Sequence, residues 1–233
     1  MTQHRLPFGN NWGGRRKGAG RKPKGERALN PRSRRPEFQA DQPVHVTLRI
    51  AEGLPSLRRP LAFEAVESAL AGANAKGLVR VVHYSVQSNH VHLIVEADGQ
   101  HWLTRGMQGL CIRMARALNR CWERIGKVFG DRYHARALKS ARQVRNAIRY
   151  VLNNFLHHGG WHTDLDRHQT DRYSSGNLFD GWRGRERCHV WRKDRQLEEQ
   201  NAGGRLSSLV PNTWLLRTGW RRWGAIGPTE SPG

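Results

Sequence analysis

The sequence predicts an α+β fold: a ferredoxin-like antiparallel sheet with helices on one face, flanked by basic N- and C-terminal extensions. Two observations carry this prediction. Strand-like and helix-like patterns follow one another in the order β-α-β-β-α-β-α, and the first six match the split β-α-β plan. Both ends of the chain are rich in Arg and Gly and lack apolar periodicity, so neither end is expected to add a second core.

The first strand is expected at residues 44–50, where β-branched residues alternate with polar ones. A helix follows from Pro60 to about Gly77, because apolar residues recur there every three or four positions. Residues 78–86 and 90–97 predict two further strands. Only a few residues separate them, which indicates a tight antiparallel connection.

A long amphipathic helix is expected from Trp102 to Ile125, and an extended segment at residues 127–138. Ser140 begins a capping-box pattern that marks the start of the last helix. That helix should end near His157, before two glycines. Its buried stripe would consist of Ile148, Val151, Leu152 and Phe155.

Three parts are therefore predicted: a basic, disordered N-terminal tail at residues 1–42, a folded domain at 43–160, and an Arg/Trp-rich extension at 161–233. Two interpretations of the extension stay open. Its tryptophans can stack on unpaired bases while its arginines pair with phosphates. Alternatively, the extension wraps the domain, with Trp214 and Leu215 as packing anchors.

The charge of the chain points to nucleic acid. Lys and Arg total 40 against 19 Asp and Glu, a formal net charge of +21. The sequence has no apolar run of the roughly 20 residues that span a bilayer, so we expect no membrane partner. Three widely spaced cysteines without a Cys-x-x-Cys pattern fit a reducing bacterial cytoplasm, with the protein at the nucleoid, and argue against a structural zinc module.

One strand carries a candidate metal site. His90 and His92 flank Val91, so both imidazoles point to one face of the strand while Val91 points to the other. Such a His-x-His pair is often an ordinary half-buried feature of a sheet. Together with Tyr150 and Asn154, which lie four residues apart on one face of the last helix, a metal-binding interpretation is favoured.

The chemistry expected of this set is attack of the Tyr150 hydroxyl on a phosphodiester, beside a divalent cation held by His90, His92 and Asn154. The product would be a phosphotyrosine bond that stores the energy for rejoining. Tyr133 is the rival nucleophile. It lies in an extended segment between arginines, and we assign it to the sheet and to DNA contact instead. No residue of the sequence is identified as the base.

Several motifs in order resemble one family. They are His90-Val91-His92 after Ser88-Asn89, residues 45–49 (His-Val-Thr-Leu-Arg), residues 129–134 (Phe-Gly-Asp-Arg-Tyr-His) and residues 149–154 (Arg-Tyr-Val-Leu-Asn-Asn). Over residues 43–160 the chain resembles the HUH single-strand endonucleases, more narrowly the IS200-like Y1 transposases and their REP-associated tyrosine transposase relatives.

The resemblance implies a single-stranded DNA endonuclease and strand transferase that acts on repeated palindromic hairpins through a covalent 5′-phosphotyrosine. Tyr150 would be the nucleophile, and His90, His92 and Asn154 would bind Mg²⁺ or Mn²⁺. Relatives often have Asn-Pro where this chain has Asn154-Phe155, so the helix is expected to continue. The long extension favours the REP-associated type and a monomer over a homodimer.

Residues predicted to contact DNA are spread along the chain: Arg21, Lys22 and Lys24 in the N-terminal tail, Arg113 and Arg116 on the long helix, Arg132 and Arg136 in the extended segment, and Trp220, Arg221 and Arg222 in the extension. The N-terminal set resembles a minor-groove peptide, or else simply adds non-specific affinity. Two other functions stay open: a DNA or RNA hairpin-binding module of the same fold that does not cleave, and a hydrolase that uses water.

Overall fold

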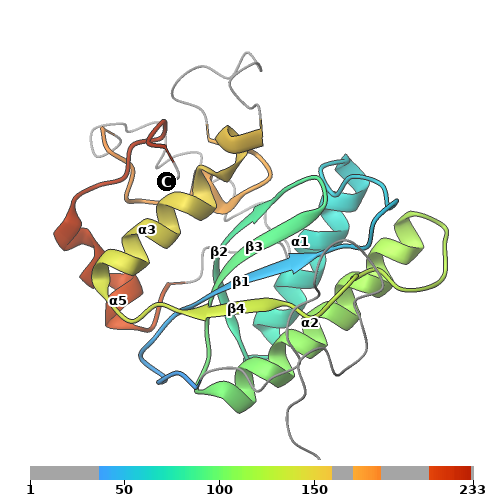
Figure 1. Ribbon diagram of the computed structural model, residues 1–233, viewed down its shortest axis with the longest axis horizontal. Coiled ribbons are helices and arrows are strands. Elements are labelled where there is room, and N and C mark those ends of the chain that lie inside the picture. Colours follow the sequence, from blue (N-terminus) through green and yellow to red (C-terminus); the bar gives the residue numbers. More distant parts are fainter. Residues whose placement is uncertain (1–36, 159–169, 185–209, 232–233) are drawn as a thin grey trace, which may run out of the picture. The chain divides into compact units, whose positions relative to one another are not determined.

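The structure, a computed structural model, describes residues 37–158, 170–184 and 210–231 (Figure 1). Contacts divide the chain into two units, residues 1–31 and residues 32–233, and every described residue belongs to the second unit. The predicted N-terminal tail lies outside the described residues except for its last six. One of these, Phe38, is buried in the core, so the folded unit begins before residue 43.

A four-stranded antiparallel sheet forms the centre of this unit. Its strands are β1 (Val44–Arg49), β2 (Arg80–Val86), β3 (His90–Glu96) and β4 (His134–Ala137), in the spatial order β2-β3-β1-β4. This is the ferredoxin-like order that the sequence predicts. β4 is shorter than the extended segment expected at residues 127–138, and Phe129 makes only an isolated bridge with Ile50.

Two helices cover one face of the sheet: α1 (Pro60–Ala75) and α2 (Gln100–Cys121) (Figure 1). The first core lies between them and the strands, because alternate strand residues such as Leu48, Val91 and Leu93 all point to this face. α2 ends four residues earlier than predicted. Glu123 adopts φ +49, in the left-handed region that interrupts a helix, and Ile125 beyond it is exposed.

The opposite face of the sheet is covered by α3 (Ala141–Leu152), as Figure 1 shows. The predicted cap is present: the Gln143 amide donates to Oγ of the N-cap residue Ser140, while Gln143 Oε1 accepts from the amide of Lys139, one residue before the N-cap position of the standard capping box. The predicted end near His157 is wrong. Asn153 leaves helical geometry, with φ −100° and ψ 9°, and residues Asn154–His158 form a separate 3₁₀ turn, η1.

A second core lies between α3 and the sheet, and the described parts of the extension complete it. These parts include the 3₁₀ turn η3 (Ser175–Leu178), the short helix α5 (Trp214–Arg217) and the 3₁₀ turn η5 (Gly219–Trp223). The buried members from the extension are Phe179, Trp182, Leu216, Trp220 and Ile226. These parts therefore wrap the domain, as one of the two interpretations predicts.

The anchors differ from those expected. Leu216 and Trp220 are buried, and the Trp220 indole N–H donates to the Leu216 carbonyl at 3.0 Å. Trp214 is half exposed and Leu215 packs only at the rim of the core. The anchors differ because of the orientation of the short helix α5, which places Leu216 in the core and leaves Trp214, its first residue, half exposed.

The free edge of β2 is covered by another part of the extension. Ser174 forms an antiparallel bridge with Ser85, and the Val86 amide donates to the Tyr173 carbonyl. Asp171 holds this segment in place through a bidentate ion pair with Arg58, at 2.7 and 2.8 Å. Within the described ranges, no helix is long and apolar enough to cross a bilayer.

Candidate metal and nucleophile site

His90 and His92 share the sheet face opposite α1 and α2. Val91 between them is fully buried in the first core, so the alternation of the strand turns both imidazoles to the α3 side. Their ring centroids lie 4.7 Å apart, in an edge-to-face arrangement. His92 is only 4% exposed. Two imidazoles are thus held side by side, as the strand pattern predicts.

Tyr150, the candidate nucleophile on α3, lies against one member of this pair, His92. The Tyr150 ring centroid is 5.1 Å from that of His92. Tyr133 lies two residues before Ala135 of β4, so its side chain is on the same face as Ala135. Both pack against the first core, under α1 and α2. The structure therefore brings Tyr150 to the histidines and places the rival tyrosine on the far face of the sheet.

Each histidine has its Nδ1 atom engaged by a neighbour. His90 Nδ1 lies 2.8 Å from Asn89 Oδ1, an acceptor, so Nδ1 carries the proton and donates. His92 Nδ1 lies 3.1 Å from Thr47 Oγ1 and 3.2 Å from His45 Nε2. Contacts of this kind fix the tautomer of a metal-binding imidazole and direct Nε2 to the metal. Both Nδ1 atoms are thus occupied by contacts within the chain.

His45 completes the aromatic cluster, with its ring centroid 5.3 Å from His92 and 5.7 Å from Tyr150. Burial, followed by the positive charges of His134 and Arg136, lowers the pKa of His45 to about 4. A neutral His45 at pH 7 can accept a hydrogen bond from the Nδ1–H of His92. Sequence reasoning used His45 and Thr47 only as part of a strand motif. Their contact with His92 follows from the β1–β3 register, in which Thr47 pairs with His92.

Asn154, the third predicted ligand, begins η1. Its side chain is buried, with 2% exposure, and its Oδ1 atom has no hydrogen-bond partner among the described residues. An orphaned buried amide oxygen is costly, and a cation would satisfy it. Among the described residues, no group of three or more His, Cys, Asp or Glu side chains is arranged so that it could hold a metal ion by itself. By donor chemistry, two imidazoles and one amide oxygen suit a divalent cation that takes its remaining ligands from water or phosphate.

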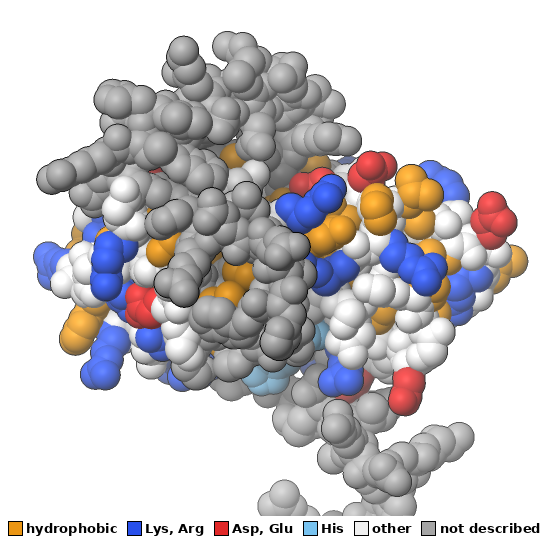
Figure 2. All heavy atoms as spheres, turned by 90° about the horizontal axis from the view of Figure 1, so that it is seen from above, with side chains coloured by type: hydrophobic (Ala, Val, Ile, Leu, Met, Phe, Trp, Pro, Cys, Tyr) orange, Lys and Arg blue, Asp and Glu red, His pale blue; other side chains and the backbone are white. Residues whose placement is uncertain are grey.

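The predicted DNA-contacting residues have varied positions. Arg136 of β4 pairs with His45, so it lies on the same sheet face as His90 and His92, and it is exposed. Arg132, just before β4, is also exposed. Arg113 and Arg116 lie on α2, which covers the other face of the sheet. Arg221 and Arg222 are exposed, while the N-terminal Arg21, Lys22 and Lys24 lie outside the described residues. Figure 2 shows Lys and Arg side chains spread over the visible surface rather than gathered in one patch.

Trp220 is a correction to the predicted DNA-contacting set. Its indole is 2% exposed and packs on Phe179, with ring centroids 5.4 Å apart. A base cannot stack on this ring in the structure, so the prediction that Trp220 contacts DNA is wrong. Its neighbour Arg221 pairs with Asp180 at 2.7 Å, on the surface.

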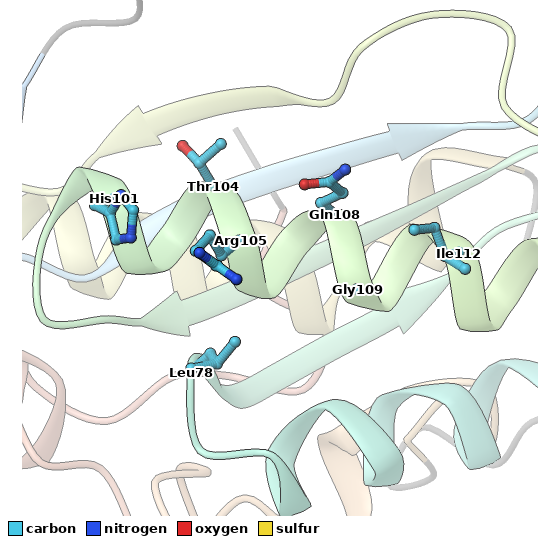
Figure 3. Close-up of a pocket in the computed structure, with 7 residues that line it drawn as sticks. All are labelled: Leu78, His101, Thr104, Arg105, Gln108, Gly109 and Ile112. Carbon is cyan, nitrogen blue, oxygen red and sulfur yellow. The ribbon is translucent and has the colours of Figure 1, made fainter.

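A hollow of about 470 Å³ lies along α2, and neither His90 nor His92 lines it (Figure 3). Figure 3 shows the side chains of His101, Thr104, Arg105 and Gln108 along the helix, with Leu78 across from them. One His and one Arg are its only ionisable side chains. The hollow is therefore separate from the candidate site and holds no comparable set of ligands.

Comparisons with known proteins give one family match and one similar solved structure. Residues 44–154 match the family model described as "Transposase IS200 like". This domain belongs to the IS200-like transposase family. A solved structure of a REP-associated tyrosine transposase bound to a REP hairpin is similar at 14% identity and a TM-score of 0.48, over 56% of this chain and 75% of that chain. No curated protein matches this chain.

The family match spans both halves of the site, from β1 to the first residue of η1. IS200-like transposases are generally metal-dependent. The donor set of His90, His92 and Asn154 suits that requirement. The remaining described segments, residues 170–184 and 210–231, lie beyond the matched region.

Proposed function

We propose that this IS200-like transposase is a metal-dependent single-stranded DNA endonuclease and strand transferase that uses Tyr150 as its nucleophile. The observation that carries the proposal is the contact of Tyr150 with His92, 5.1 Å between ring centroids, on a face where the imidazoles of His90 and His92 lie side by side. Residues from β3 and α3, about 60 positions apart, meet here within one chain.

In the proposed reaction, the Tyr150 hydroxyl oxygen attacks a DNA phosphorus atom, and the bond from phosphorus to the 3′ oxygen breaks. A proton leaves the tyrosine, and the departing 3′ oxygen takes one up. The 5′ phosphate stays bonded to Tyr150, so one phosphoester bond replaces another. A free 3′ hydroxyl can later reverse the step and rejoin DNA.

The metal would be held by His90, His92 and Asn154, and a bound Mg²⁺ or Mn²⁺ would neutralise charge that builds on the non-bridging oxygens. The chain itself orients the reaction. Asn89 contacts Nδ1 of His90, and Thr47 and His45 contact Nδ1 of His92, which leaves each Nε2 as the nitrogen that would bind the metal. α3 holds the phenol of Tyr150 against them, which limits the geometries in which it can meet a phosphate.

We propose hairpin-forming single-stranded DNA as the substrate. The net charge of +21 supports a nucleic-acid partner, and exposed Arg136 lies on the same sheet face as the histidines. The extension supports the REP-associated type suggested by the sequence, for which repeated palindromic hairpins are the expected targets.

The test uses labelled hairpin DNA, Mn²⁺ or EDTA, and a denaturing gel. We expect wild-type protein to form a metal-dependent covalent adduct that Tyr150→Phe and His90→Ala/His92→Ala both lose. Tyr133→Phe is the matched control and should retain it. Cleaved DNA without an adduct would favour a hydrolase. Tight binding with intact DNA across a hairpin library would favour the non-cleaving module.

We also propose that one chain suffices for catalysis, because Tyr150 contacts His92 of the same chain. Mixing Tyr150→Phe with His90→Ala/His92→Ala tests this directly. A site built from one chain leaves each variant defective, so the mixture should form no adduct. Adduct formation in the mixture would instead show that two chains exchange their helices.

A further inference from the structure

The segment of residues 210–231, called the strap here, is attached to the end of β3. The Glu96 carboxylate accepts hydrogen bonds from the Asn212 amide at 2.8 Å, the Thr213 amide at 2.8 Å and the Thr213 hydroxyl at 2.7 Å. Glu96 is 4% exposed. Three charge-assisted bonds to one buried carboxylate make this a firm attachment. β3 is also the strand that carries both histidines.

The other end of the strap is attached to α3. The Glu230 carboxylate accepts from Arg145 through both oxygens, at 2.9 and 3.1 Å, and from Arg149 at 3.1 Å. Asn153 Nδ2 donates to the Gly227 carbonyl at 3.0 Å and to the Glu230 carbonyl at 2.8 Å. Arg145 also donates to two strap carbonyls, those of Gly224 and Ala225.

The spacing of these contacts relates them to the site. Arg145, Arg149 and Asn153 are four residues apart, so they follow one side of α3 and its end. Arg149 immediately precedes Tyr150, and Asn153 immediately precedes Asn154. The strap therefore contacts the same turns of chain that carry the nucleophile and the proposed amide ligand.

Between its two ends, the strap packs on α3 through Leu216, Trp220 and Ile226. Glu230 is the point where charge concentrates. Burial alone would raise its pKa, but hydrogen bonds from Arg145, the Gly227 amide and Arg149 outweigh this and lower the pKa of Glu230 to about 2. Arg145 is mostly buried, so loss of the carboxylate would leave its charge without its ion-pair partner.

We propose that the strap holds α3 against β3 and that Glu230 is a positioning residue for Tyr150 and Asn154. This inference rests on the proposed function, since it assigns a role in that same site. The histidines lie on β3 and the candidate nucleophile lies on α3, and the strap is hydrogen-bonded to both of these elements. A small displacement of a reacting group lowers rates steeply, so a loosened α3 would slow the attack while leaving DNA binding intact.

The experiment uses the full-length protein and the variants Glu230→Gln, Glu230→Asp and Asp180→Asn. Asp180→Asn is the matched control, because it breaks an exposed ion pair to the same strap, with Arg221. Three quantities are measured on each: the single-turnover rate of adduct formation at saturating hairpin DNA, the DNA concentration that gives half of that rate, and amide hydrogen exchange across residues 145–154.

For Glu230→Gln we expect a rate about 10- to 100-fold lower, with half-saturation changed less than about twofold. Exchange across residues 145–154 should rise. Glu230→Asp, which keeps the charge, should recover part of the rate, and Asp180→Asn should match wild type. A rate equal to wild type in folded Glu230→Gln, or a higher rate, would overturn the proposal. So would a defect confined to half-saturation, which would make Glu230 a DNA-binding determinant.

Failure of the proposed function gives a different result. If wild-type protein formed no adduct, hydrogen exchange would still report on the strap. Increased exchange in Glu230→Gln but not in Asp180→Asn would support the strap's hold on α3. Unchanged exchange would overturn it whatever the reaction is.

Discussion

The two faces of the sheet are built in different ways. The face under α1 and α2 is apolar and is closed by elements that are close neighbours in the sequence. The other face carries five histidines. It is covered by α3, by residues 170–184 and by the strap, which begins more than 70 residues after the end of β4. The first face supplies stability from local patterns, whereas the second holds the candidate site and depends on long-range polar contacts.

Removal of His90 and His92 should give the largest difference between the two faces of the sheet. His90→Ala/His92→Ala removes both proposed imidazole ligands, so Mn²⁺ binding measured by calorimetry should disappear. His101→Ala, on the α2 side of the sheet, should bind Mn²⁺ like wild type. Retained Mn²⁺ affinity in the double variant would show that the metal binds elsewhere.

A pair of leucine truncations compares the two cores. Leu110 is fully buried in the first core and Leu216 in the second. Leu110→Ala should cost about 2–5 kcal/mol in the free energy of unfolding, measured in urea, with the adduct rate of the folded protein unchanged. Leu216→Ala should lower the adduct rate as well, because it loosens the strap. Equal behaviour of the two variants would contradict the division of roles.

The contact of Thr47 with His92 allows a finer test. Thr47→Val keeps the shape of the side chain but removes the hydroxyl that lies 3.1 Å from His92 Nδ1. Loss of such a contact typically lowers metal affinity by about 10- to 100-fold, and we expect the lower end because His45 still contacts the same nitrogen. Thr47→Ser is the control, and it should preserve Mn²⁺ affinity in the same titration.

The smallest effect concerns pH and the strap. Because the folded-state pKa of Glu230 is lowered to about 2 from its ordinary 4.5, its stabilising contribution is complete above pH 4.5. It is lost as the pH falls from there toward 2. The fluorescence of buried Trp220 should report loosening of the strap in this window. Glu230→Gln should flatten that part of the curve, and an identical curve would assign the transition to other groups.

Much of the fold follows from patterns within single segments. The alternation around Val91 places the two histidines on one face, and the spacing of Ile148 and Val151 predicts the buried side of α3. The sequence also predicts the strand order through the split β-α-β plan. The first two depend on residues close together in the chain, where the period of a helix or strand decides the outcome, and the strand order depends on the order of the elements.

The remaining features depend on contacts between distant segments. The role of His45 appears only once the β1–β3 register is known. α3 ends at Leu152 where Asn153 turns its side chain to the strap, and no local signal marks that change. Likewise, Trp220 resembles an exposed stacking residue in the sequence, but it is buried because residues 179–182 pack against it.

The most direct measurement is to identify the residue that becomes attached to DNA. The covalent adduct formed with Mn²⁺ and hairpin DNA is digested with nuclease and protease, and the remaining nucleotide is located by mass spectrometry. We expect a nucleotide on the peptide that contains Tyr150, linked through its 5′ phosphate. A nucleotide on the Tyr133 peptide, or cleaved DNA with no modified peptide, would contradict it.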